Sequence, residues 1–310
     1  GLLIGMFLGS FSGTLLGLYW LRESFSSRLI PSLLREMVTY STPLVFSGVA
    51  IWINLYIDRI MINHFLSIDD LGLYAIGFRI ASIAGLAIIG IQDALTPLIF
   101  KNFKKEETPR QLAKLFRFFV VFALFIFLSL SLFTKDLLKL LTTESFYGGG
   151  IVVAYLVPAI LLGNMYIFAP GISIAKKTKF IAYINVTGAT LNIILNYFLI
   201  PKLGIVGAGI ATLLTKLIIF MMYMTLSQKF YPVPHRWKAI IMLTISACII
   251  VILMSDLQIN DLHRWFINAI VILSFFFIAI ITKIISHEEI EQAYRLIKRR
   301  LRHLRAASSS

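Results

Sequence analysis

The sequence predicts an all-α polytopic membrane protein with about nine transmembrane helices. Of its 310 residues, 58% are hydrophobic and only 14% are charged. A soluble domain of this length could not bury so much apolar surface in one aqueous core. The apolar residues form long stretches separated by short connections, and the basic residues are unevenly divided among those connections. Together these observations indicate that lipid surrounds most of the chain.

Nine apolar stretches follow one another along the chain. They occupy residues 1–20, 37–63, 73–99, 117–134, 151–175, 181–199, 207–227, 239–255 and 266–282. Each is close to the roughly 20 residues that an α-helix needs to cross the hydrocarbon core of a bilayer. Pro158 and Pro170 lie in the fifth stretch, and a proline inside a helix removes a backbone hydrogen bond and bends it. We therefore expect a kinked helix there, either static or used in gating.

Glycines indicate two of the turns. Three of them, at positions 148–150, give the connection before the fifth stretch wide backbone freedom. Gly204, Gly207 and Gly209 predict a tight hairpin between the sixth and seventh stretches, followed by a smooth helix face that allows close packing. No predicted strand precedes this run, so a phosphate-binding loop is excluded.

Basic residues predict the orientation of the chain. Of its 29 lysine and arginine residues, 22 lie in every second connection, at Arg117 where the fourth stretch begins, or in the C-terminal tail. Loops rich in Lys and Arg are retained in the cytoplasm during insertion, so these regions mark the cytoplasmic side. We therefore expect the chain to begin outside and to have a cytoplasmic C-terminus. An odd number of spans also suggests an upstream part with spans of its own.

The tail at 283–310 has a different pattern from the spans. Residues 284–304 combine basic residues with apolar ones at steps of three and four, which predicts a basic amphipathic helix. Such a helix is expected to lie against anionic membrane lipids of the inner leaflet. A solvated helix and a contact with a partner protein are the alternatives.

Composition excludes several functions. The net charge of +14 is divided among short loops and a tail, so no nucleic acid is expected as a partner. No catalytic constellation is present, and we do not expect an enzyme. The five histidines lack metal-ligand spacing with one another or with Cys248, the single cysteine. We therefore expect no metal, no resident cofactor and no disulfide.

Apart from Arg117 at the edge of the fourth stretch, five ionisable residues lie within predicted spans, where they are costly unless they face a partner or a cavity. They are Asp58, Arg59, Arg79, Asp93 and Lys216. Asp58 and Arg79 fall at similar depth on antiparallel helices, so the two can form an ion pair that holds the hairpin together. In the functional interpretation, Arg59, Arg79 and Lys216 instead bind an anionic substrate group.

Asp93 and three amides are further candidates for the site. Asp93 is close to the inner end of its span, where it can take up a proton or a sodium ion or cap the inner mouth. Asn54 is one turn before Asp58, and Asn192 and Asn196 are one turn apart, so each set shares a helix face. These amides either bind a hydroxyl-rich substrate or connect helices through hydrogen bonds.

Four passages resemble a known family in their order and content. They are Tyr-Ser-Thr-Pro-Leu-Val at 40–45, Asn-Leu-Tyr-Ile-Asp-Arg at 54–59 with Leu-Gly-Leu-Tyr at 71–74, Asp-Ala-Leu-Thr-Pro at 93–97, and the segment 192–211. In this order they resemble the polysaccharide flippases of the multidrug/oligosaccharidyl-lipid/polysaccharide superfamily, which includes the O-antigen (Wzx-type) translocases.

The resemblance implies a MATE-like transporter with two lobes and fourteen helices, of which the nine spans are helices 6 to 14. Residues 1–36 then form the last helix of a truncated first lobe and a cytoplasmic linker. Residues 37–227 form the second six-helix lobe, residues 228–282 form two extra helices, and residues 283–310 form the cytoplasmic tail.

The resemblance also implies a function. The family flips an undecaprenyl-pyrophosphate-linked oligosaccharide, such as an O-antigen repeat unit, across the bacterial cytoplasmic membrane by alternating access. Asp58 or Asp93 is then a candidate for coupling to H⁺ or Na⁺ entry. The expected partners are the lipid-linked oligosaccharide, membrane lipids and other polysaccharide-assembly proteins. The alternatives are a cation-coupled multidrug antiporter of the same superfamily and a scaffold that does not transport.

Overall fold

The computed structural model describes residues 1–24, 30–255 and 261–281. Within these ranges all regular structure is helical, with no strand, which confirms the predicted all-α class. The chain divides into two compact units, Gly1–Thr42 and Pro43–Ser310. The predicted amphipathic helix of the tail at 283–310 lies outside the described residues.

The first unit contains α1 (Leu2–Leu21), the short 3₁₀ helix η1 (Arg22–Ser24) and the beginning of α2 (Pro31–Phe65). The described side chains of α1 are nearly all exposed, although most of them are apolar. A helix of 20 residues that is apolar all around is long enough to cross a bilayer and suits a lipid environment.

Two long helices open the second unit. The rest of α2 is followed by α3 (Ile68–Asn102), and each helix has 35 residues in all. Ser67 begins α3 as its N-cap: its hydroxyl accepts a hydrogen bond from the Asp70 N–H, and the Asp70 carboxylate accepts one from the Ser67 N–H. This reciprocal cap stabilises the sharp turn between the two helices.

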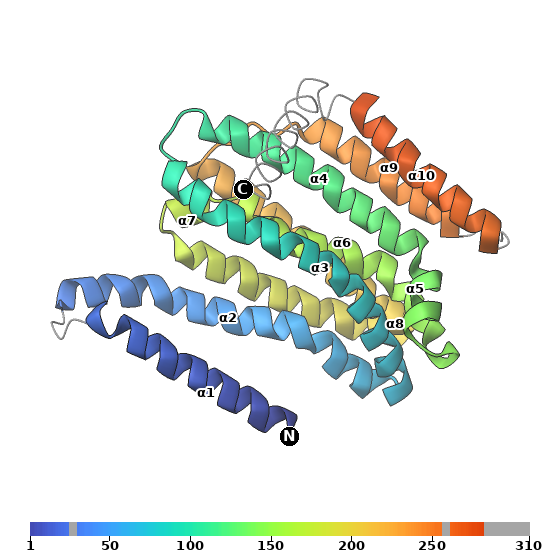
Figure 1. Cartoon of the computed structure of the whole chain (residues 1–310), viewed down its shortest axis with the longest axis horizontal. Helices are drawn as coiled ribbons and strands as arrows, with labels where there is room; N and C mark the ends of the chain where they lie inside the picture. The colour runs from blue at the N-terminus through green and yellow to red at the C-terminus, as the bar shows by residue number, and fades with distance from the viewer. Residues whose placement is uncertain (25–29, 256–260, 282–310) are drawn as a thin grey trace, which may run out of the picture. The chain divides into compact units, whose positions relative to one another are not determined.

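The core of this unit surrounds α6 (Val153–Asn164), which packs against α3, α4 (Thr108–Leu132) and α8 (Thr178–Phe230). Its residues Val153, Leu156 and Val157 have no exposed surface. Figure 1 shows α6 among these three helices. The apolar contacts around α6 therefore form the centre of the hydrophobic core of this unit.

The fifth predicted span is broken rather than kinked. It begins at the end of the 3₁₀ helix η2 (Glu144–Val152) and continues through α6, a second 3₁₀ helix η3 (Met165–Phe168) and the four-residue α7 (Gly171–Ile174). Pro158 lies inside α6 and leaves it continuous, whereas Pro170 stands at the break between η3 and α7. Since proline has no N–H and clashes with the preceding turn, a helix ends readily at such a residue.

The glycines at 148–150 belong to η2 and permit close packing. A Cβ added to Gly149 would lie 2.3 Å from the carbonyl oxygen of Leu73, and one added to Gly77 would lie 2.4 Å from the carbonyl oxygen of Gly149. The two backbones approach so closely that neither glycine can carry a side chain. The predicted flexible turn is therefore a tightly packed helical segment.

α8 contains two antiparallel helices, here named its first arm (residues 178–203) and its second arm (residues 205–230). They are separated at Gly204, whose φ of 60° and ψ of −143° are non-helical and suit glycine alone. After the turn, a Cβ on Gly207 would lie 2.3 Å from the carbonyl oxygen of Leu199. Farther along, Asn192 of the first arm donates a hydrogen bond to Thr215 of the second arm at 3.4 Å. The predicted hairpin is confirmed.

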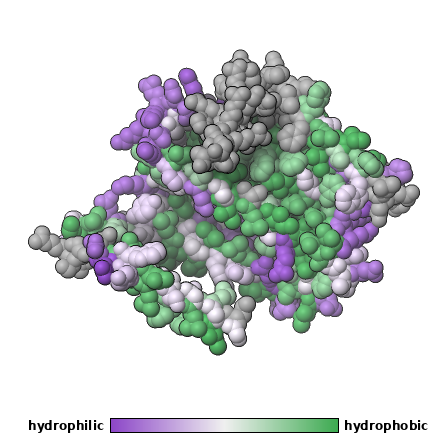
Figure 2. All heavy atoms as spheres, viewed as in Figure 1, coloured by the Kyte–Doolittle hydropathy of each residue, from purple (hydrophilic) through white to green (hydrophobic). Residues whose placement is uncertain are grey.

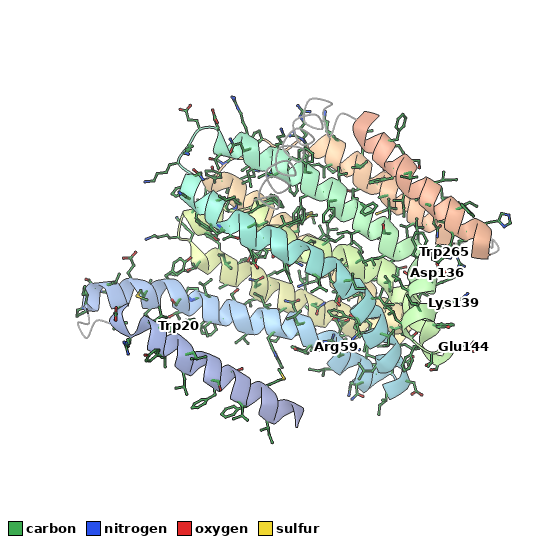
Figure 3. The ribbon with its side chains drawn as sticks, viewed as in Figure 1. Trp20, Arg59, Asp136, Lys139, Glu144 and Trp265 are labelled. Atoms are coloured by element: carbon green, nitrogen blue, oxygen red, sulfur yellow. The ribbon has the colours of Figure 1, made fainter. Side chains whose placement is uncertain are left out.

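The last two described helices, α9 (Trp237–Ser255) and α10 (Asp261–Ile281), pack on α4 (Figure 1). Polar contacts connect the start of α10 to α5 (Thr134–Leu141). The Asp136 carboxylate accepts hydrogen bonds from the Arg264 guanidinium and the Trp265 indole, each at 3.0 Å. Figure 3 shows Asp136 beside Trp265. These bonds set the position at which α10 begins.

Seven helical segments among the described residues are long and apolar enough to cross a membrane. One of the seven is α8, which contains two predicted spans, and α10 includes the shorter apolar helix His263–Phe275. Each of the nine predicted spans therefore corresponds to a helical part of the structure. On the face seen in Figure 2, apolar residues cover the middle of the helices and hydrophilic residues gather towards their ends. The chain is a polytopic membrane protein.

Candidate functional site

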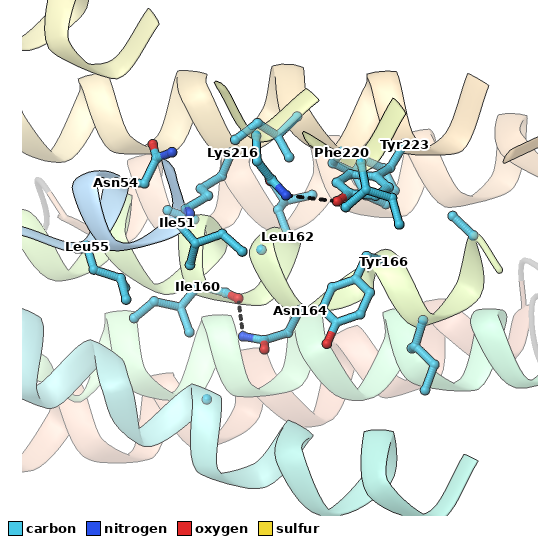
Figure 4. A pocket seen from close by; sticks show the side chains of 18 of the residues that line it. Ile51, Asn54, Leu55, Ile160, Leu162, Asn164, Tyr166, Lys216, Phe220 and Tyr223 are labelled. Carbon is cyan, nitrogen blue, oxygen red and sulfur yellow. Dashed lines mark hydrogen bonds between the residues drawn. The ribbon is translucent and has the colours of Figure 1, made fainter. Parts of the chain in front are cut away.

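The second unit contains a cavity of about 880 Å³. Residues of α2, α3, α6, the broken segment after α6 and both arms of α8 line it. Figure 4 shows the cavity from close by. Most of its lining is apolar, but it includes the oppositely charged residues Asp58 and Lys216. A volume of this size is typical of a binding site for a small molecule or for part of a larger one.

Lys216 extends from the second arm of α8 into the cavity (Figure 4). A Cβ on Gly163 would lie 3.5 Å from Cδ of Lys216, so the lysine stem passes along α6. The ammonium group interacts electrostatically with Asp58. Among the residues that the structure describes, however, it has neither an ion pair nor a hydrogen-bond acceptor. A cation in such surroundings attracts an anionic ligand, because direct pairing is how a protein compensates a buried charge.

Asp58 lies at the centre of a cluster of hydrogen bonds. Its Oδ2 accepts bonds from the hydroxyls of Tyr74 and Thr212, each at 2.7 Å, and its Oδ1 accepts one from the Asn196 amide at 2.8 Å. The side chain is only 3% exposed. The donors come from α3 and from both arms of α8, so one carboxylate connects α2 to three helical segments. We call these four residues the carboxylate cluster.

Three amide oxygens near this cluster have no hydrogen-bond partner among the described residues. They are the buried Oδ1 atoms of Asn54, Asn192 and Asn196. Their amide nitrogens are already engaged: that of Asn192 with Thr215, that of Asn196 with Asp58, and that of Asn54 with a main-chain carbonyl. A buried polar atom without a partner costs about 1–3 kcal/mol, so a ligand that satisfies it is stabilised. Oxygen atoms of this kind suit a hard cation.

The expected ion pair between Asp58 and Arg79 is not formed in the described part of the chain. Asp58 is engaged in the carboxylate cluster, and Arg79 is exposed. The guanidinium of Arg59 stacks 4.6 Å above the ring of Phe78, which lines the cavity, whereas Arg59 itself is not among the lining residues. Similar depth on two helices does not fix where side chains point, because successive residues are rotated by about 100° around the axis.

Arg79 and Asp93 occupy the exposed face of α3. Ser82, Leu86 and Ile89 lie between them on the same side of the helix, since each residue in this series is three or four positions from the next. These three residues line the cavity. Arg79 and Asp93 are exposed, and neither is a lining residue. The substrate-binding roles of Arg59 and Arg79 and the ion-coupling role of Asp93 stay predictions.

A second group of polar residues was missed by the sequence analysis. The Asn185 amide donates hydrogen bonds to Ser47 Oγ at 2.7 Å and to Tyr223 Oη at 3.1 Å. Tyr166 and Tyr223 also line the cavity. A signal for Asn185 was present, because it precedes Asn192 by seven residues and therefore shares a helix face with it. The tyrosines gave no such signal.

The break after α6 lies on the wall of the cavity. Tyr166, Ala169 and Pro170 all line it, and this is where η3 gives way to α7. Irregular backbone at membrane depth is tolerated where it is buried in protein or faces a polar cavity. The interrupted helix thus brings polar and aromatic groups to the cavity.

The described residues do not form a typical metal-binding site. They contain no group of three or more His, Cys, Asp or Glu side chains that could hold a metal ion. The oxygen atoms around Asp58 comprise one carboxylate with neutral amides and hydroxyls. Such a set fits a monovalent cation or a proton better than a tightly held divalent metal.

Comparisons with known proteins agree with the resemblance found in the sequence. A family described as "Polysaccharide biosynthesis protein" matches residues 1–103. The Lsg locus putative protein 1 of Haemophilus influenzae is 30% identical over 76 residues, which is 24% of this chain and 19% of that protein. The multidrug resistance protein NorM of Vibrio parahaemolyticus is 28% identical over 203 residues, which is 60% of this chain and 43% of that protein. No solved structure matches the chain.

The matched regions span less than half of the length of either relative. The two relatives also differ in what their names describe, since one is named for a genetic locus and the other for drug resistance. The comparisons therefore bear on the family and leave the substrate open.

Proposed function

We propose that this chain, which belongs to the multidrug/oligosaccharidyl-lipid/polysaccharide superfamily of membrane transporters, is part of a flippase for a lipid-linked oligosaccharide. The substrate is an undecaprenyl-pyrophosphate-linked oligosaccharide, an O-antigen or other surface polysaccharide repeat unit. It is moved by alternating access across the bacterial cytoplasmic membrane, with the C-terminus of the chain on the cytoplasmic side.

The observation that supports this proposal best is Lys216, a cation in the cavity wall without a direct partner among the described residues. A pyrophosphate has several anionic oxygens, and hydrogen bonds between charged groups are roughly twice as strong as neutral ones. Lys216 of α8 binds the pyrophosphate, and Arg59 of α2 and Arg79 of α3 assist from outside the cavity lining. The polyprenyl tail stays in lipid, where it loses no apolar contact.

We also propose that the carboxylate cluster couples transport to a cation, H⁺ or Na⁺. Asp58 supplies the charge, and the unpaired oxygens of Asn54, Asn192 and Asn196 supply further acceptors. The ammonium of Lys216 interacts electrostatically with Asp58. A cation bound at Asp58 therefore weakens the attraction between that carboxylate and Lys216, and this links cation binding to headgroup binding.

Partners follow from the same proposal. The lipid-linked oligosaccharide and membrane lipids contact the helices, and the basic tail at 283–310 contacts anionic lipids or other polysaccharide-assembly proteins. In this proposal the transporter has no resident cofactor, no metal centre and no nucleic acid partner.

A multidrug antiporter is the second candidate, because NorM is similar to this chain over the longer of the two matched regions. Asp58 is the residue that favours it, since a buried carboxylate can bind a cationic drug. Lys216 opposes it, because a cation in the same cavity repels a cationic drug. Lys216 therefore favours binding of an anionic headgroup and disfavours binding of a cationic drug.

The test is Lys216→Met in the full-length protein, expressed in cells that lack their own copy. Methionine keeps the apolar stem and removes the charge, so outer-leaflet glycan should fall at least tenfold, as expected for one lost charged hydrogen bond. Lys202→Met is the matched control, because Lys202 is exposed near the turn of α8 and is not a lining residue.

Surface glycan and drug susceptibility are measured together, at equal protein levels. If Lys216→Met leaves the glycan unchanged while drug resistance rises, the flippase proposal is wrong and the antiporter is favoured. If Lys202→Met causes the same loss of glycan as Lys216→Met, the cavity lysine has no special role.

A further inference from the structure

We propose that the cavity contains a sugar-binding subsite formed by Tyr166, Tyr223 and Asn185, distinct from the position at which Lys216 binds the headgroup. This inference rests on the proposed function. It adds that the flippase recognises the first sugars of its substrate and not only the pyrophosphate.

Two tyrosine rings from different elements lie next to each other in the cavity wall. Tyr166 comes from η3 and Tyr223 from the second arm of α8, and their ring centroids are 6.4 Å apart with planes inclined by 41°. Tyr166 is 53% exposed although it lies beside the core. Figure 4 shows both rings at the same part of the cavity. Exposed aromatic faces provide stacking surface for the C–H groups of a sugar ring.

Polar groups lie next to the Tyr223 ring. The Asn185 amide donates to Tyr223 Oη at 3.1 Å and to Ser47 Oγ at 2.7 Å, which fixes its orientation. In the described part of the chain, Asn185 Oδ1 and Tyr166 Oη have no hydrogen-bond partner. Sugar hydroxyls are both donors and acceptors, so a mixture of amide and hydroxyl groups next to an aromatic face suits them.

The charge of Lys216 lies at a distance from this subsite, along the second arm of α8. Lys216 and Tyr223 are seven residues apart on the same arm of α8, which is two turns or about 10 Å. Thr212, which holds Asp58, is one turn from Lys216 in the opposite direction. The lining residues around the tyrosines are uncharged. A headgroup bound at Lys216 therefore places the attached sugars against a neutral, aromatic wall.

A cationic drug could also stack on tyrosine, through attraction between the charge and the ring. Lys216 disfavours this occupant, because it lies two turns away in the same cavity. A neutral sugar that is covalently attached to an anionic group can contact the tyrosine rings while the anionic group binds Lys216. The arrangement of cation and rings therefore favours a glycolipid over a drug.

The test uses full-length protein in lipid nanodiscs and two probes, undecaprenyl pyrophosphate and undecaprenyl-pyrophosphate-linked glycan extracted from the producing strain. Tyr166→Ala is expected to weaken binding of the glycan-bearing lipid about tenfold and to leave binding of the bare lipid unchanged. Lys216→Met is expected to weaken binding of both. Tyr183→Ala is the matched control, because Tyr183 is 64% exposed on the first arm of α8 and is not a lining residue. Tyr166→Leu serves if the alanine variant does not fold.

The outcomes separate this inference from the proposed function. If the Tyr166 variants weaken both probes equally or neither, the sugar subsite is wrong, while a loss with Lys216→Met still supports a headgroup site. If wild-type protein binds the bare lipid as tightly as the glycan-bearing lipid, the subsite is also wrong. If Lys216→Met changes binding of neither probe, the headgroup site itself is overturned.

Discussion

Asp58 accepts three hydrogen bonds from three helical segments. All three can form at once because both oxygens of a carboxylate are acceptors. In Asp58→Asn, one carboxylate oxygen becomes an NH₂ group that faces another donor. At least one of Tyr74, Thr212 and Asn196 then loses its acceptor, at a cost of about 1–3 kcal/mol. The variant should fold with a lower melting temperature and should no longer transport in response to an imposed sodium or proton gradient.

Melting is followed for the purified full-length protein, and transport is followed in vesicles with each gradient in turn. Asp93→Asn is the control for the melting measurement, because Asp93 is exposed on α3. Gradient-driven transport by Asp58→Asn at the wild-type rate would contradict a coupling role for this carboxylate.

Single residues also show where sequence reasoning stops. Lys216 was predicted because a charge within an apolar span is rare and costly, and the structure places it in the lining of the cavity, while its role in binding stays a prediction. Tyr74 and Thr212 were missed because hydroxyl groups are common in such spans, and only the folded hairpins bring them to Asp58. Arg79 was predicted to meet Asp58 from depth alone, but the rotation of α3 leaves it exposed.

At the scale of elements, the hairpin of α8 depends on the absence of one side chain. In Gly207→Ala the added Cβ would lie 2.3 Å from the Leu199 carbonyl oxygen and 2.5 Å from its carbonyl carbon, and backbone atoms cannot move aside cheaply. The two arms must separate, which should lower the free energy of unfolding by about 1–3 kcal/mol or more.

Gly90→Ala is the matched control for this prediction. Nothing lies within 4 Å of a Cβ at Gly90, which is inside α3. Alanine there should be neutral or stabilising by about 0.5–1 kcal/mol, since glycine is a poor helix former. Both variants are compared by thermal unfolding in the same detergent, and equal melting temperatures would show that the hairpin is not tightly closed.

Most elements were predictable because helices of membrane length leave a strong one-dimensional signal. All nine predicted spans have helical counterparts, and Gly204 and Gly207 indicated the reversal in α8 correctly. The break between η3 and α7 was predicted only as a kink, because proline indicates a weak point without showing whether the helix continues beyond it. Packing of α6 against its neighbours decides that, and packing is not visible in the order of residues.

At the scale of the whole second unit, His235 lies where several elements meet. Its ring is 4.7 Å from that of Phe116 in α4 and 5.1 Å from that of Trp237 at the start of α9, measured between centroids. Neither ring nitrogen has a hydrogen-bond partner among the described residues. Burial lowers the pKa of His235 from 6.5 to about 4. The folded protein therefore keeps this ring neutral at ordinary pH.

The low pKa of His235 in the folded protein makes its stability depend on pH. Between pH 6.5 and 4 the unfolded chain binds a proton at this position and the folded chain does not, so stability is full above about pH 6.5 and falls as the pH decreases towards 4. In His235→Phe, which preserves an aromatic ring, this part of the acid sensitivity should disappear. Melting temperatures of both proteins are compared from pH 7.5 to 4.5, and parallel curves would contradict the assignment.

α2 differs from the other long helices in how it is attached. It buries only five side chains, of which Ser47, Asn54 and Asp58 are polar. Its polar contacts with other helices include those of Ser47 and of Asp58, and its main apolar contact with the core is made by Ile62 and its neighbours near the end of the helix. A ligand or a force that broke these few contacts would therefore detach α2 as one unit, and the packing around α6 would not have to change.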